Sequence, residues 1–126
     1  MAEIKVKEAN DRGIRVFVGG CVERGDGSSF RAKAHAHCYP SDKHRNWVCI
    51  RSAKRLLTPA GLPSLLLWEE IAHCLIPFSN GHNATFYRKL KELSGVMPKH
   101  GKQVVARQRH FSKKYARRRQ RRNRLV

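Results

Sequence analysis

The chain has 126 residues, with 27 Lys and Arg against 9 Asp and Glu, so its formal net charge is +18. This length suits one compact domain, or a small domain with an arm, and excludes a multidomain enzyme. No apolar run approaches the ~18–20 residues of a membrane span, and the N-terminus lacks the apolar core of a signal peptide, so we expect no membrane span.

Alternating apolar and polar residues dominate the first fifty positions. Residues 4–6 and 14–18 alternate on either side of turn-forming residues 10–13, which predicts a β-hairpin. Residues 30–38 alternate as well, and predict a long strand with basic and histidine side chains on one face. Residues 47–51 predict a further short strand.

The pattern then changes to helical spacing. Residues 63–76 are nearly all apolar and rich in helix formers, with Pro63 suited to the first turn and Pro77 to the end. Residues 83–93 predict a second helix that stops at Gly95. The sequence therefore predicts an α+β fold, with a small antiparallel or mixed sheet followed by two helices.

Positive charge is concentrated at the C-terminal end. Residues 98–126 hold 12 Lys and Arg and no acid, whereas residues 1–97 hold 15 basic and 9 acidic residues. We therefore expect a domain at 1–97 and a basic arm at 98–126. A solvated tail is one interpretation, but uncompensated charge favours phosphate, so we expect sequence-independent binding of DNA or RNA. The residues expected to bind are Arg107, Arg109, Lys113, Lys114, Arg117, Arg118, Arg119, Arg121, Arg122 and Arg124.

The four cysteines, Cys21, Cys38, Cys49 and Cys74, are widely spaced and form no C-x-x-C pair. This spacing favours buried free thiols in a reducing compartment, which predicts a cytoplasmic or nucleoid-associated protein.

Another group of residues, apart from the helical one described next, has side chains of the kinds that bind metals: His35, His37, Cys38 and His44. On a strand, His35 and His37 share a face while Cys38 points to the other, so we expect surface histidines and no second metal there.

Charged residues interrupt the apolar helix predicted at 63–76. Glu69 and His73 are four residues apart, so they lie on one face and can reach a single ion, and Glu70 lies beside them. Because a buried unpaired carboxylate is costly, such groups are usually paired, protonated or bound to metal. His82 follows nine residues after His73.

The segments LLWEEIAH (66–73) and GHNATF (81–86) together resemble the active-site region of SprT-like metallopeptidases and related small zincins. The family pattern is an H-E-x-x-H helix, a short loop and a G-H-x-x-x-F segment. The resemblance spans about residues 46–93, and residues 47–51 resemble the strand that lines the substrate cleft. The resemblance implies that Zn²⁺ is the cofactor and that His73 and His82 are zinc ligands. It also implies that Glu70 is the catalytic general base, which activates a water molecule for attack on a peptide bond of a protein substrate.

Glu69 stands where the family has its first histidine. In one interpretation Glu69 replaces that histidine as a zinc ligand, since two histidines and a glutamate form a catalytic set in other zincins. In the other, tight metal binding has been lost and the fold survives as a scaffold.

Two functions therefore compete at the level of sequence. The first is a SprT-like zinc metallopeptidase, or a degenerate derivative, that associates with nucleic acid through its basic tail. The second is a non-catalytic DNA- or RNA-binding or packaging protein on a former peptidase scaffold. Binding to anionic membranes is a weaker third alternative.

Overall fold

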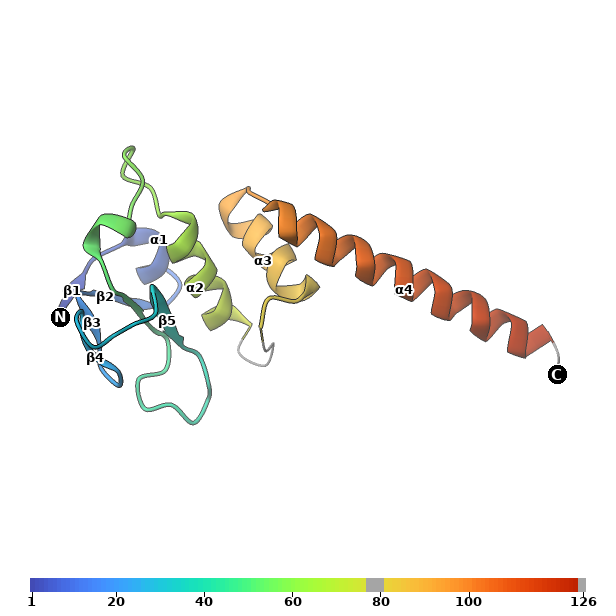
Figure 1. Ribbon diagram of the computed structural model, residues 1–126, viewed down its shortest axis with the longest axis horizontal. Helices are drawn as coiled ribbons and strands as arrows, with labels where there is room; N and C mark the ends of the chain where they lie inside the picture. The colour runs from blue at the N-terminus through green and yellow to red at the C-terminus, as the bar shows by residue number, and fades with distance from the viewer. Residues whose placement is uncertain (77–80, 125–126) are drawn as a thin grey trace. The chain divides into compact units, whose positions relative to one another are not determined.

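The computed structural model describes the backbone of residues 1–76 and 81–124, and the side chains of residues 1–76 and 81–122. The chain forms two compact units, Met1–Asn80 and Gly81–Val126 (Figure 1). The first contains a β-sheet and the helix with the two glutamates, and the second contains two helices. The predicted α+β fold class is confirmed.

The main sheet has four strands, in the order β1 (Ala2–Ile4), β2 (Arg15–Val18), β6 (Trp47–Ile50) and β5 (Ala34–His37). Strands β2 and β6 are parallel, whereas β1 pairs with β2, and β5 with β6, in antiparallel fashion. The sheet is therefore mixed, and β5 lies at one edge. The antiparallel pairing of the first two predicted strands and the strand at residues 47–51 are confirmed.

The connections differ from the sequence prediction in two places. The link between β1 and β2 contains a short helix, α1 (Lys7–Asn10), in addition to a turn. After β2 the chain forms a small second hairpin from β3 (Gly20–Cys21) and β4 (Gly25–Asp26).

The predicted long strand at residues 30–38 is wrong, because only β5 is extended and paired. Asp26 explains the difference. Its carboxylate accepts hydrogen bonds from the backbone of Ser28 and Ser29, and its carbonyl accepts one from the Phe30 amide at 2.8 Å. This turn places the Phe30 side chain in the core, where it is 1% exposed. The strand therefore begins later along the chain than predicted.

The sheet presents two different faces. In the observed register Phe17 pairs with Cys49 and Cys49 pairs with His35, which places these three side chains on one face. Val16, Val48 and Ala36 pair across the same strands on the opposite face. All three are buried. The Cys38 thiol, two residues beyond Ala36, interacts electrostatically with Glu70 and Cys74 of the following helix, so this helix covers the second face.

That helix, α2 (Leu65–Leu75), confirms the prediction for residues 63–76. It begins one residue after Ser64, whose hydroxyl accepts a hydrogen bond from the Leu67 amide at 3.2 Å and donates one to the Arg55 carbonyl at 2.6 Å. Pro63 therefore precedes the N-cap and is not part of the first turn. Leu67, Ile71 and Ala72 are fully buried and anchor the helix. The predicted end at Pro77 lies outside the described residues.

Replacing Ser64 with alanine removes this cap and leaves the Leu67 amide without its partner. We expect the free energy of unfolding to fall by about 1 kcal/mol, measured by urea denaturation. Ser64→Thr retains the hydroxyl and is the matched control. An alanine variant as stable as the parent would show that solvent satisfies this helix end equally well.

The second unit contains α3 (Ala84–Ser94) and α4 (Lys99–Arg124). Asn83 caps α3 by accepting a hydrogen bond from the Phe86 amide at 3.0 Å, and Gly95 ends it in the left-handed region at φ 75°, as predicted. Helices α3 and α4 pack closely at Gly101, where an added Cβ would lie 2.5 Å from the Tyr87 ring. None of the described helices has an apolar stretch long enough to cross a bilayer.

Candidate functional site

Helix α2 carries the first set of candidate site residues. Glu69, Glu70 and His73 all lie within Leu65–Leu75, and each is half-buried. The four-residue spacing places Glu69 and His73 on one face, one turn apart, as predicted. Their helix packs against β5 and β6, so these groups lie between the apolar core and the surface of the first unit.

Glu70 has the most perturbed environment of the three. Burial, assisted by the negative charge of Glu69, raises the pKa of the Glu70 carboxyl to about 7. The nearby Cys74 thiol is buried as well, and its pKa is raised to about 12 mainly by that burial. A carboxyl group whose pKa is close to 7 can hold or release a proton under physiological conditions, which is the property that acid–base chemistry needs.

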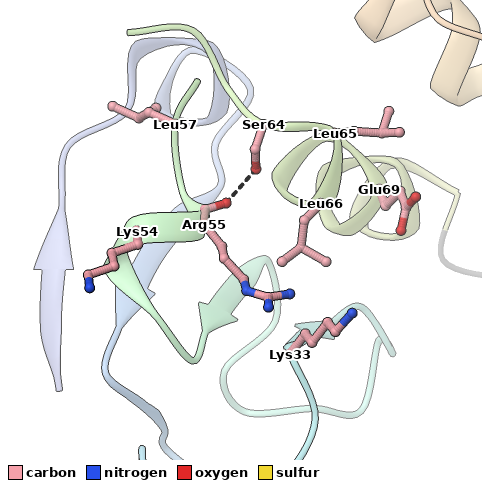
Figure 2. Close-up of a pocket in the computed structure, with 8 residues that line it drawn as sticks. All are labelled: Lys33, Lys54, Arg55, Leu57, Ser64, Leu65, Leu66 and Glu69. Atoms are coloured by element: carbon pink, nitrogen blue, oxygen red, sulfur yellow. Dashed lines mark hydrogen bonds between the residues drawn. The ribbon is translucent and has the colours of Figure 1, made fainter. Parts of the chain in front are cut away.

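Glu69 forms part of the wall of an open pocket of about 480 Å³ in the first unit (Figure 2). Three basic side chains line the same pocket: Lys33 from the segment before β5, and Lys54 and Arg55 from the short 3-10 helix Ala53–Arg55. Figure 2 labels the Lys33, Arg55 and Leu66 side chains among those that line this pocket. The three basic residues were not predicted from the sequence, because they come from separate segments with no shared motif.

His82, the third predicted ligand, belongs to the second unit. Its exposed ring stacks on the buried Phe86 ring, with centroids 4.4 Å apart and an interplanar angle of 7°. The G-H-x-x-x-F segment therefore forms the start of α3, and its histidine packs on its phenylalanine. Because Glu69 and His73 lie in the other unit, the convergence of all three on one ion stays a prediction.

A second group of candidate ligands lies on the other face of the sheet. Cys21, His37 and Cys49 are all buried, and their sulfur and nitrogen atoms lie within 4.8 Å of one another. The Nε2 atom of His37 is 3.5 Å from Cys21 Sγ and 3.5 Å from Cys49 Sγ. The described residues thus include a cysteine–histidine group positioned to hold a metal ion.

The prediction that His37 is a surface histidine is wrong, since its side chain is 0% exposed. The expectation of free thiols is confirmed: all four cysteines are free, three are buried and Cys38 is half-buried. Among the described residues, Cys38 lies outside both groups of potential metal ligands. Burial raises the pKa of the Cys49 thiol to about 12.

Carboxylates surround the other ring nitrogen of His37. Its Nδ1 lies 3.0 Å from Asp42 Oδ2 and 3.6 Å from Glu23 Oε1. Glu23, His35 and His37 form a second group of potential ligands, but Glu23 is exposed and Asp42 already occupies Nδ1. Asp42 is itself fixed, because its Oδ1 accepts a hydrogen bond from the His44 amide at 2.8 Å.

Helix α4 accounts for residues 99–124 of the predicted basic arm at 98–126. Every side chain from residue 106 to residue 122 is exposed, including the predicted phosphate-binding residues in this range. The side chain of Arg124 lies outside the described residues. Tyr115, Arg118 and Arg122 line one shallow surface hollow, and Lys113 and Arg117 contribute to another.

Comparisons with known proteins returned nothing: no protein-family model, curated protein or solved structure matches this chain.

Cys21 and Cys49 were predicted from the sequence as free thiols, but not as ligands that converge with His37. They lie 16 and 12 residues from His37, so no short motif joins them. The signal that could have found Cys49 is strand pairing: opposite His35, it must share a face with His37.

Proposed function

We propose that the first unit is a zinc-dependent peptide hydrolase domain of the SprT-like kind, and that α4 associates it with nucleic acid. The observation that supports hydrolysis is the placement of Glu69, Glu70 and His73 on a single helix that packs over the edge of a mixed sheet. This is the arrangement that the E-E-x-x-H segment predicts if it corresponds to a zincin active-site helix.

The donor atoms on α2 suit zinc. Carboxylate oxygen and imidazole nitrogen are both zinc ligands, and Glu69 and His73 supply one of each from adjacent turns. His82, at the start of the second unit, supplies the third donor in this proposal. When bound, zinc supplies a Lewis acid that polarises a carbonyl and lowers the pKa of water.

Glu70 performs the proton transfer in this proposal. Its carboxylate accepts a proton from the attacking water and delivers it to the amine nitrogen that leaves when the peptide bond breaks. The half-buried position on α2 holds the carboxyl group in place and limits competing solvent.

The basic pocket beside Glu69 suggests the substrate class. Lys33, Lys54 and Arg55 contribute three positive charges around a hollow of about 480 Å³ (Figure 2). Acidic peptide segments complement such a surface, so we propose that acidic substrates are cleaved faster than basic ones.

The experiment is zinc analysis combined with hydrolysis of an unfolded acidic protein. We expect His73→Ala and His82→Ala each to lose one equivalent of zinc relative to the parent. Glu70→Gln should keep the zinc and lose hydrolysis by about 10²–10⁴-fold. Glu92→Gln, an exposed glutamate on α3, is the matched control. Zinc content unaffected by His73→Ala, or full activity in Glu70→Gln, would refute the assignment.

A non-catalytic nucleic-acid-binding protein is the second candidate, and α4 favours it specifically. Helix α4 has 26 residues, exposes basic side chains and contains no acidic residue, so no carboxylate within the helix neutralises this charge. Phosphate contacts of this kind give affinity without base specificity. Nucleic-acid binding in the absence of zinc at α2 and of hydrolysis would favour this alternative.

A further inference from the structure

We propose that Cys21, His37 and Cys49 form a buried zinc site, separate from the ligands on α2. The three residues come from β3, β5 and β6, so the fold itself assembles the group. They lie on the face of the sheet opposite α2, and all three belong to the first unit. This site therefore does not depend on the proposed hydrolase function.

The spacing of the donor atoms is the first argument. With Zn–S near 2.3 Å, Zn–N near 2.05 Å and tetrahedral angles, a sulfur and a nitrogen on the same ion lie about 3.6 Å apart. Both observed separations between a cysteine Sγ and His37 Nε2 are 3.5 Å. Both sulfur–nitrogen separations thus match a tetrahedral ion, and the two sulfurs lie within 4.8 Å of each other.

The lone pairs of the three side chains face one common region. The Asp42 carboxylate accepts from His37 Nδ1, which in a neutral imidazole leaves Nε2 with a single lone pair. Both sulfurs lie at the same distance from that lone pair, and the two cysteine side chains also hydrogen-bond with each other. A cation at the common point of three lone pairs satisfies both sulfurs and the nitrogen together.

Asp42 acts as the partner that orients a metal-binding histidine. Metal ligands of this type commonly donate the second ring N–H to a carboxylate, which fixes the tautomer and the ring orientation. Here the contact is 3.0 Å, and Asp42 is held in turn by the His44 amide.

Burial and charge select the kind of ion. Two thiolates and a neutral imidazole around Zn²⁺ give zero net charge, which lowers the cost of burying the group. The cysteines belong to an apolar cluster with Phe17 and Phe30, where hard, strongly hydrated ions such as Mg²⁺ would lose their water. Three protein ligands leave one position for a small ligand such as water.

The ion would join three strands that hydrogen bonds and apolar packing already connect. Because it binds the folded chain and not the unfolded one, it stabilises the fold by mass action. We therefore expect chelation to lower the melting temperature, and added zinc to restore it.

Cobalt substitution of the full chain provides the test, because thiolate–Co²⁺ pairs absorb strongly in the near ultraviolet and carboxylate–histidine sites do not. We expect one equivalent of Co²⁺ to produce this band, and one equivalent of Zn²⁺ to remove it. The band should be lost in Cys21→Ser and Cys49→Ser, and retained in Cys74→Ser and in His73→Ala. Cys74→Ser is the matched control, since Cys74 is buried but lies outside the group.

The parent protein alone can overturn the proposal, so it remains testable if a serine variant does not fold. Absence of a thiolate band after Co²⁺ is added to the reduced parent chain would refute the site. Retention of the band in both serine variants would do the same. Binding of Cu⁺ but not Zn²⁺ would refute the choice of ion, and a Cys21–Cys49 disulfide in freshly purified protein would identify a redox pair instead.

Discussion

Replacing Glu70 with glutamine should remove a large pH dependence from the stability of the metal-free protein. The pKa of this carboxyl is about 7 in the folded chain, because of burial and the nearby charge of Glu69, against an ordinary value of 4.5. Below pH 4.5 the group is protonated in both the folded and unfolded states and has no effect. Between pH 4.5 and 7 the unfolded state releases its proton while the folded state retains it, so stability falls as pH rises.

The expected loss is about 3 kcal/mol, complete above pH 7, since each pKa unit corresponds to about 1.4 kcal/mol. Urea denaturation of chelator-treated protein at pH 4, 6 and 8 measures it. Glu70→Gln should be more stable than the parent by about this amount at pH 8 and equal to it at pH 4. Glu92→Gln, at an exposed position of α3, should follow the parent throughout. A parent whose stability does not fall relative to Glu70→Gln between pH 4 and 8 would contradict the raised pKa.

The parts of the fold that follow from local sequence were predictable. Helix α2 was predicted from its apolar run, and α3 from its spacing and from Gly95. Strand β6 was predicted at residues 47–51. In each of these segments propensity, capping and burial favour the same structure, so no tertiary contact had to override the local preference.

The segment before β5 shows where local reasoning failed. Alternation from residue 30 to residue 38 indicated one strand, but the side chain of Asp26 stabilises a turn that draws Phe30 into the core. Hydrogen bonds between an aspartate side chain and the nearby backbone compete with strand pairing. The alternation of apolar and polar residues does not reveal these hydrogen bonds.

The candidate sites divide in the same way. Glu69, Glu70 and His73 could be found because helical spacing brings residues within one turn together. The Cys21, His37 and Cys49 group could not, because it depends on strand order and register, and the pairing of β5 with β6 and of β6 with the distant β2 was not predicted. Without the strand order, the sequence did not indicate that these three side chains lie close together.

The last prediction concerns the basic surface of α4. Replacing five arginines with glutamine should lower the affinity for a duplex of mixed sequence by at least tenfold at low salt, and should make the remaining binding less sensitive to salt. The reason is counterion release: each phosphate neutralised contributes about −0.9 to the slope of log K against log salt. The replaced residues are Arg117, Arg118, Arg119, Arg121 and Arg122.

Substitution is preferable to truncation after Gly101. Val105 is buried, and Gly101 packs against Tyr87, so removing the whole helix would disturb the second unit as well as its charge. The matched control removes the same number of charges from exposed positions of the first unit, through glutamine at Lys5, Arg24, Arg31, Lys43 and Arg45. Equal losses in both variants would show that net charge, and not α4, determines binding.

A structural readout accompanies the change in affinity. Like charges four residues apart, such as Lys113 with Arg117 and Arg118 with Arg122, destabilise a free helix. Phosphate neutralises them, so nucleic acid should increase the helical signal of the parent in far-ultraviolet circular dichroism. The five-glutamine variant should be more helical than the parent without nucleic acid, and should change less when it is added. Loss of helical signal on binding would mean that the residues of α4 do not contact phosphate as a helix.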